Sequence, residues 1–226
     1  MNEPKQYQGA GAFRRALEAR LLGQSLKEGV DKQRLRRKVA FDRLLARLFA
    51  NVEKESPWVL KGGYAMELRI QSARTTKDID LTLRSGRVAA SDADQQSKQL
   101  RELVQEFSSA SLPDYFQFLV GQAMLELGGA PGGGYRYPIE ARMDGRMFTK
   151  FHLDIGIGDE ILTPLEVING WIGLDSQVSR HPRSRCFRAS SNGQKSSTPT
   201  RARAREDRIH ASKIWWICCF FTRKVR

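Results

Sequence analysis

Two aspartates separated by one residue are the clearest sign of chemistry in this sequence. Asp78 and Asp80 lie in the stretch KDIDLTL, where polar and apolar residues alternate. This period of two predicts a strand with both aspartates on one face and Ile79 and Leu81 on the other. Two neighbouring carboxylates on a half-buried strand repel each other unless a cation neutralises them. A hard divalent ion that prefers oxygen ligands, Mg²⁺ or Mn²⁺, is the expected partner.

A pair of glycines, Gly62 and Gly63, comes before these aspartates at the start of a predicted helix. Glycine lets the backbone approach a phosphate closely, and the first N–H groups of a helix can bind an anion. Lys61 and Arg74 are the basic residues that we consider candidates for holding a nucleotide triphosphate, although each could also be an ordinary surface charge. A metal-binding strand beside a phosphate-binding helix start is suited to the transfer of a nucleotidyl group.

A third carboxylate is expected, because two divalent ions need more ligands than two aspartates provide. The candidate is Asp154 in the stretch FHLDIGIGD, where apolar residues alternate and leave Asp154 on the opposite face. The alternative is an exposed strand carboxylate without a metal. Asp159 follows a glycine and is predicted to be a turn residue. We assign no role to His152 from the sequence.

The segment LKGGYAMELR followed by RTTKDIDL resembles the AbiEii/AbiGii-type toxins of bacterial toxin–antitoxin and phage-defence systems, within the polymerase-β-like nucleotidyltransferases. The resemblance covers roughly residues 35–175. It implies a toxin that transfers NMP from an NTP to an acceptor, with RNA, including the 3′ end of a tRNA, among the acceptors, and a cognate antitoxin as partner. The implied metal ligands and catalytic residues are Asp78, Asp80 and Asp154, with Mg²⁺ or Mn²⁺ as cofactor. Nucleotide binding is assigned to Gly62, Gly63, Lys61 and Arg74.

The wider sequence predicts an α+β fold with a small mixed sheet and flanking helices. Amphipathic or short helices are expected at 10–22, 31–52, 63–70 and 94–110, and strands at 58–60, 78–84, 135–143 and 147–157. Residues 114–127 form a segment of mixed pattern. The glycine-rich stretch 128–138 is predicted to be a hairpin-type loop, since no strand precedes it and no helix pattern follows it.

Charge is unevenly distributed along the chain. The last 51 residues contain 13 of the 38 basic residues and two of the 25 acidic ones, so residues 1–175 are nearly neutral, with 25 basic and 23 acidic. All three cysteines also lie after residue 175. We therefore expect a nucleotidyltransferase core at 1–175 and a basic Ser/Arg-rich tail at 176–226. The core shows no signal peptide or membrane span, which predicts a cytoplasmic protein.

The tail has no periodicity and is expected to be disordered, with the C-terminal helical part of the family missing. We interpret it as translated out of frame. Reading the last base of each codon with the first two of the next, the stretch WWICC must encode Val, Asp, Leu or Met, and Leu. Residues 210–219 can then encode RVKDLVDLLL, an amphipathic helix that resembles the C-terminal helices of the family. Residues 194–200 can encode EKLHAY, whose lysine matches one expected at the triphosphate. The shift would begin near residue 175, and the activity of this chain is therefore expected to be impaired.

Two other functions stay open at this point. The basic tail could bind nucleic acid in a non-catalytic remnant of the enzyme, since clustered Lys and Arg attract phosphates. The same catalytic core could also modify a small molecule, such as an antibiotic hydroxyl group.

Overall fold

The computed structural model describes residues 7–50, 56–70, 75–84, 88, 92–128, 130–159, 161, 165–170 and 186–189. Its helices are α1 (Ala10–Glu28), α2 (Lys32–Leu48), α3 (Gly62–Arg69) and α4 (Ala93–Ser108). Aspartates cap two of them: Asp31 accepts a hydrogen bond from the Arg34 N–H at the start of α2, and Asp92 does so from the Gln95 N–H at α4. Such caps satisfy N–H groups that have no partner within the helix.

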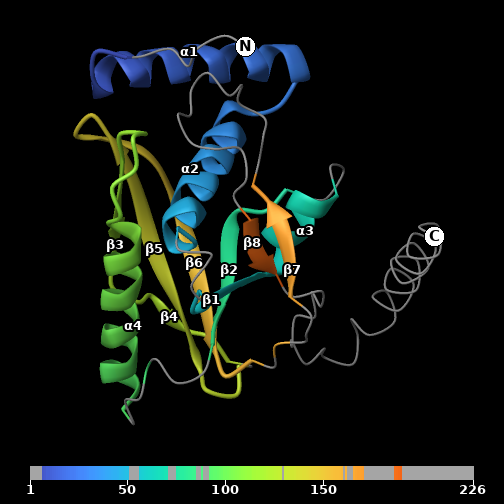
Figure 1. The fold of residues 1–226 in the computed structure, drawn as a ribbon, viewed down its shortest axis with the longest axis vertical. Coiled ribbons are helices and arrows are strands. Elements are labelled where there is room, and N and C mark those ends of the chain that lie inside the picture. Colours follow the sequence, from blue (N-terminus) through green and yellow to red (C-terminus); the bar gives the residue numbers. More distant parts are fainter. Residues whose placement is uncertain are drawn as a thin grey trace, which may run out of the picture. The chain divides into compact units, whose positions relative to one another are not determined.

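The described strands form one mixed sheet in the order β3-β5-β6-β2-β1-β8-β7, with β4 also paired to β5 (Figure 1). The pairs β2–β6 and β1–β8 are parallel, and the others are antiparallel. The strand bounds are β1 Trp58–Lys61, β2 Asp78–Leu83, β3 Phe116–Val120, β4 Leu125–Glu126, β5 Gly134–Met143, β6 Arg146–Ile157, β7 Glu166–Asn169 and β8 Cys186–Ala189.

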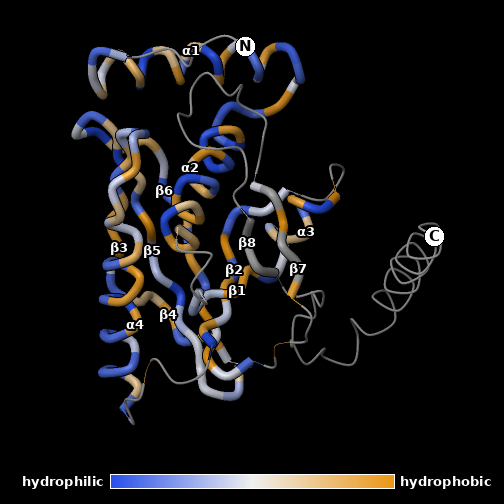
Figure 2. The backbone as a smooth tube through the Cα atoms, viewed as in Figure 1, coloured by the Kyte–Doolittle hydropathy of each residue, from blue (hydrophilic) through white to orange (hydrophobic). Residues whose placement is uncertain are grey.

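One face of this sheet carries the hydrophobic core, and α2 and α4 pack against it. The ring of Phe41 on α2 lies 4.8 Å from that of Phe151 on β6, and Phe107 on α4 lies 5.9 Å from Trp58 on β1. Along both helices, hydrophobic positions alternate with hydrophilic ones at helical spacing (Figure 2). Burial of these apolar side chains is the main force that holds the helices on the sheet.

The alternation that the sequence showed in β2 and β6 is confirmed. Ile79 and Leu81 are fully buried on the core face, as are Leu153 and Ile155 of β6. The opposite face of the same two strands therefore carries the aspartates. The α+β class and the small mixed sheet with flanking helices are also confirmed.

Most predicted elements have their expected type, with shifted ends. The first helix extends to Glu28, where Gly29 ends it in the left-handed conformation, and the segment of mixed pattern forms β3 and β4. The glycine-rich loop joins two antiparallel strands, β4 and β5, as a hairpin. In the predicted tail the structure describes only residues 186–189, which form β8, a strand that the sequence did not predict. The remainder of 176–226 lies outside the described residues.

Candidate active site

Four charged side chains form a continuous row across four neighbouring strands. Lys61 of β1 lies opposite Asp80 of β2, Asp80 lies opposite Asp154 of β6, and Asp154 lies opposite Arg136 of β5. Residues directly opposite each other in a sheet point to the same face. The row therefore runs cation, carboxylate, carboxylate, cation on the face away from the core.

Arg136 and Asp154 form a bidentate ion pair in this row. The Nε and one terminal nitrogen of Arg136 each donate a hydrogen bond of 2.7 Å to a different oxygen of Asp154. The same terminal nitrogen lies 3.8 Å from the carboxylate of Asp78. The hydrogen bonds with Asp154, together with the nearby carboxylates, raise the pKa of Arg136 above its usual value, so this guanidinium stays charged.

Asp78 extends the acidic cluster along β2 and contacts a histidine. It lies opposite His152 of β6, whose Nδ1 is 3.2 Å from an oxygen of Asp78. The side chains of both residues are partly exposed. His152, to which the sequence assigned no role, thus lies at the rim of the carboxylate cluster.

A second small network lies at the other end of β2. The Thr82 hydroxyl donates a 2.7 Å hydrogen bond to Asp159, and the ammonium of Lys61 forms an ion pair with the same carboxylate. Asp159 is therefore more than a turn residue, because it joins β1 and β2 to the end of β6. Lys61 lies beside the site, as the sequence predicted, but its charge is directed to Asp159.

The glycine pair places the start of α3 directly against this face. Gly62 has a φ of 69°, a conformation that residues with a side chain rarely adopt, and a Cβ atom there would overlap the carboxylate of Asp80. A Cβ atom on Gly63 would lie 2.8 Å from the hydroxyl oxygen of Thr76. The side chain of Lys61, the residue that precedes α3, makes no capping hydrogen bond to this helix. The start of this helix thus lies against Asp80, and the first N–H groups of a helix can bind an anion.

A buried glutamate holds α3 and the approach to β2 in place. Glu67 of α3 accepts a 3.1 Å hydrogen bond from the backbone N–H of Thr76, two residues before Asp78. Its other oxygen lies 2.7 Å from the ammonium of Lys38 and 3.5 Å from the guanidinium of Arg34, both on α2. Glu67 therefore links three segments that together position the first aspartate.

The donor set suits a hard divalent ion, but the carboxylates do not converge as they stand. Asp78, Asp80 and Asp154 offer only oxygen atoms, the ligands that Mg²⁺ and Mn²⁺ prefer. Within the described part of the chain, however, no three acidic, histidine or cysteine side chains are grouped closely enough to hold a metal. The positive charge beside Asp154 and Asp78 is the guanidinium of Arg136. The oxygen donors therefore suit the chemistry of a divalent ion, while in the structure the guanidinium of Arg136 pairs with Asp154.

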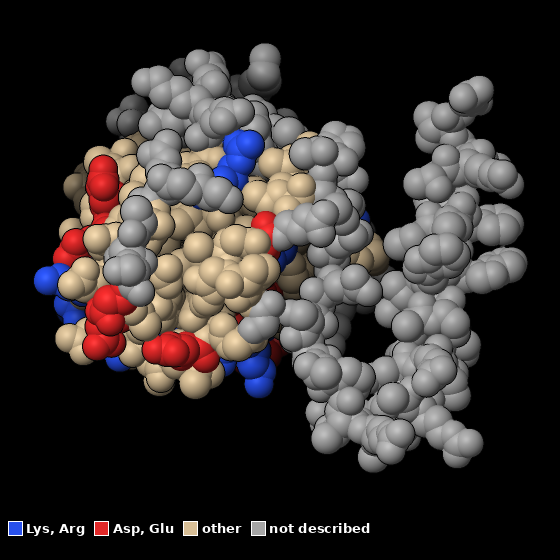
Figure 3. All heavy atoms as spheres, turned by 90° about the horizontal axis from the view of Figure 1, so that it is seen from below, with Lys and Arg blue, Asp and Glu red and all other residues tan. Residues whose placement is uncertain are grey.

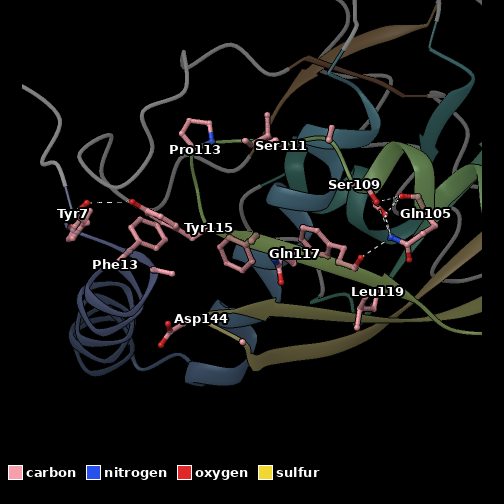
Figure 4. Close-up of a pocket in the computed structure, with 17 residues that line it drawn as sticks. Tyr7, Phe13, Gln105, Ser109, Ser111, Pro113, Tyr115, Gln117, Leu119 and Asp144 are labelled. Atoms are coloured by element: carbon pink, nitrogen blue, oxygen red, sulfur yellow. Dashed lines mark hydrogen bonds between the residues drawn. The ribbon is translucent and has the colours of Figure 1, made fainter.

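A separate hollow of about 960 Å³ lies between α1, the end of α4 and β3 (Figure 4). Aromatic rings from Phe13, Tyr115 and Phe116 contribute to its walls. Of the predicted metal and nucleotide ligands that the structure describes, none lines it. The hollow is thus distinct from the carboxylate face.

The structure brings together most of the site residues that the sequence predicted. Asp78, Asp80 and Asp154 share one face, and Lys61, Gly62 and Gly63 adjoin it. Arg74 lies outside the described residues. Sequence reasoning missed Arg136, although the alternation of Tyr135, Tyr137 and Ile139 would have placed it on the polar face of its strand.

Comparison with protein families gives one match. The family model described as "Nucleotidyl transferase AbiEii toxin, Type IV TA system" matches residues 43–171, which include the glycine pair and all three aspartates. No significant match is found among curated proteins. Among the described helices, none combines the length and the apolar character needed to span a membrane.

Proposed function

The chain belongs to the AbiEii nucleotidyl transferase toxin family of type IV toxin–antitoxin systems, and on this premise we propose that its carboxylate face transfers NMP from an NTP to an acceptor hydroxyl group. The observation that supports this most strongly is the direct pairing of Asp80 with Asp154, with the start of α3 against Asp80. A family of this kind implies an antitoxin, and a nucleotidyltransferase fold implies an NTP. The proposed acceptor is RNA, such as the 3′ end of a tRNA.

The proposed reaction gives each residue a defined task. Asp78, Asp80 and Asp154 would hold Mg²⁺ or Mn²⁺, which when bound neutralises phosphate charge. The backbone N–H groups at Gly62 and Gly63 would bind the triphosphate, and Lys61 could assist after leaving Asp159. Asp154 would accept the proton of the acceptor hydroxyl. The hydroxyl oxygen then forms a bond to the α-phosphorus, the bond from that phosphorus to the bridging oxygen breaks, and pyrophosphate leaves.

The out-of-frame interpretation of residues 176–226 limits what this chain can do. A lysine at the triphosphate would be absent, and the loss of one preorganised donor from an enzyme site can reduce the rate by about 10²–10³. Sequencing the gene across codons 170–226 tests this point. One missing base near codon 175 would support it, and an intact frame would make the basic tail and β8 genuine parts of the protein.

The transfer reaction itself is tested with α-³²P-labelled NTPs, Mg²⁺ and total bacterial RNA, using both this chain and a version with the frame restored. We expect label on RNA with the restored protein and little with Asp80→Asn, because the aspartate pair would be broken. Equal labelling by the restored protein and its Asp80→Asn variant would refute the proposed site. Label on a small molecule but not on RNA would move the proposal to an antibiotic-type substrate.

Binding of nucleic acid without catalysis is less well supported. On the face shown in Figure 3, the described acidic and basic side chains are scattered around a largely uncharged surface, and they form no continuous basic patch there. The binding function considered from the sequence uses the basic tail, nearly all of which lies outside the described residues. RNA binding that weakens with salt and survives Asp80→Asn would favour it.

A further inference from the structure

Arg136 occupies both oxygen atoms of Asp154, the atoms that this residue would offer to a metal ion. Both oxygens of Asp154 accept hydrogen bonds from its guanidinium, and Asp78 lies 3.8 Å away. Asp154 is well shielded, with 13% of its side chain exposed, whereas 32% of the Arg136 side chain is exposed. The cation is therefore the partner with access to solvent and with room to move.

A divalent ion and this guanidinium compete for the same oxygen atoms. Arginine does not lose its proton at any ordinary pH, so it cannot yield to the metal by becoming neutral. An ion that takes Asp154 as a ligand must break at least one of the two hydrogen bonds. The guanidinium then needs another anion, and its planar pair of donors matches phosphate as well as it matches carboxylate.

We propose that Arg136 is an exchangeable counter-ion of this site: it neutralises Asp154 while no metal is bound, and it turns to the triphosphate of the nucleotide when the metal binds. This inference rests on the proposed function, since it assumes that the three aspartates take a divalent ion. It adds a nucleotide-contacting residue on β5, a strand to which neither the glycine pair nor the aspartates belong. Lys61, at the other end of the charged row, has its own carboxylate partner in Asp159.

The test compares two kinds of binding in the full chain, without any transfer reaction. The affinity for Mn²⁺ alone is measured by titration, with the free ion followed by electron paramagnetic resonance. The affinity for inorganic tripolyphosphate is measured separately by calorimetric titration at saturating Mg²⁺. Removal of the competing cation in Arg136→Met should tighten Mn²⁺ binding by about tenfold, since a hydrogen bond between charged groups is the interaction removed. The same variant should bind tripolyphosphate about tenfold more weakly or worse, because the bidentate phosphate donor is lost.

Arg142→Met is the matched control. Arg142 lies on the same strand, and its guanidinium pairs with Glu140 at 2.6 Å, outside the cluster of aspartates. This variant should change neither affinity. If Arg136→Met does not fold, as judged by circular dichroism, Arg136→Lys replaces it. Lysine keeps the charge but cannot hold both oxygens of Asp154 at once, so tighter Mn²⁺ binding is still expected.

In Arg136→Met, the affinity for Mn²⁺ and the affinity for tripolyphosphate must change in opposite directions. An arginine that only stabilises the sheet would leave both unchanged or weaken both, and either result overturns the inference. Failure of the proposed function looks different: the unmodified chain would bind no Mn²⁺, or would bind it equally well after Asp80→Asn. Mn²⁺ binding that depends on Asp80 but is not tightened by Arg136→Met would overturn this inference alone.

Discussion

Replacing Gly62 by alanine would place a methyl group where the structure puts the carboxylate of Asp80. Gly62 has a φ of 69°, and a Cβ atom there overlaps the side chain of Asp80. The overlap can be relieved only if Asp80 rotates away or if the start of α3 moves back from β2. Either change separates the aspartate from the helix terminus, so both metal binding and phosphate binding should suffer.

The expected effect of Gly62→Ala has two parts, a loss of stability and a loss of Mn²⁺ affinity, and the same substitution at Gly29 allows them to be separated. Gly29 ends α1 with a φ of 65°, and nothing lies within 4 Å of a Cβ atom built there. Alanine at Gly29 therefore has only the cost of a left-handed backbone, about 1–2 kcal/mol of unfolding free energy. Alanine at Gly62 should have that cost as well and should also lower Mn²⁺ affinity by about 10- to 100-fold, the usual effect of disturbing the support of a metal ligand.

The assay measures urea unfolding and Mn²⁺ titration for both variants beside the unmodified protein. Gly29→Ala should lose stability and keep its Mn²⁺ affinity, whereas Gly62→Ala should lose both. The reasoning is refuted if Gly62→Ala binds Mn²⁺ as the unmodified protein does, because Asp80 would then not be held against the start of α3.

Three further variants test the support of the site and the core. The side chains of Arg47 and Asp114 are both about 1% exposed and are joined by two hydrogen bonds of 3.0 and 2.7 Å. Arg47→Met would leave the Asp114 carboxylate buried without its partner, so the free energy of unfolding should fall by about 3–5 kcal/mol. A loss below about 1 kcal/mol in urea titration would contradict this. Glu67→Gln weakens the ion pair with Lys38 and should lower the free energy of unfolding by about 1–3 kcal/mol. It should also weaken Mn²⁺ binding. Unchanged Mn²⁺ binding would show that Glu67 does not position the aspartates. Burial raises the pKa of Tyr137 to about 12. The neutral phenol therefore contributes stability to the folded state below pH 10, and this contribution is lost as the pH rises toward 12. Tyr137→Phe should flatten the dependence of unfolding free energy on pH in that range, and an unchanged dependence would contradict the raised pKa.

Local patterns in the sequence predicted the elements and the faces of the site strands well. Alternation alone assigned Asp78 and Asp80 to one face of a strand, because each neighbouring apolar residue needs the core. The same argument placed Asp154 correctly on β6. What such patterns cannot give is register between strands far apart in the chain, so the pairing of Asp80 with Asp154 came from the structure.

Arg136 shows most clearly why sequence reasoning stopped short. The hairpin of β5 and β6 pairs Met143 with Arg146, and an unbroken register from there would set Arg136 opposite Leu153. An irregularity between Ala141 and Arg142 shifts the register by one residue and sets Arg136 opposite Asp154 instead. A bulge of this kind leaves no reliable mark in the sequence. The role of Asp159 was hidden for a similar reason, since its partners Lys61 and Thr82 are distant in the chain.

The binding of a nucleotide that depends on a divalent ion tests the central claim most directly, because it does not require the acceptor to be known. Equilibrium dialysis of each labelled NTP would be measured with the unmodified chain and with Asp80→Asn, in the presence of Mg²⁺ and of a chelator. The account predicts binding that requires Mg²⁺ and is lost in Asp80→Asn, while the variant keeps its fold by circular dichroism. Nucleotide binding of equal strength in both proteins, or without Mg²⁺, would contradict it.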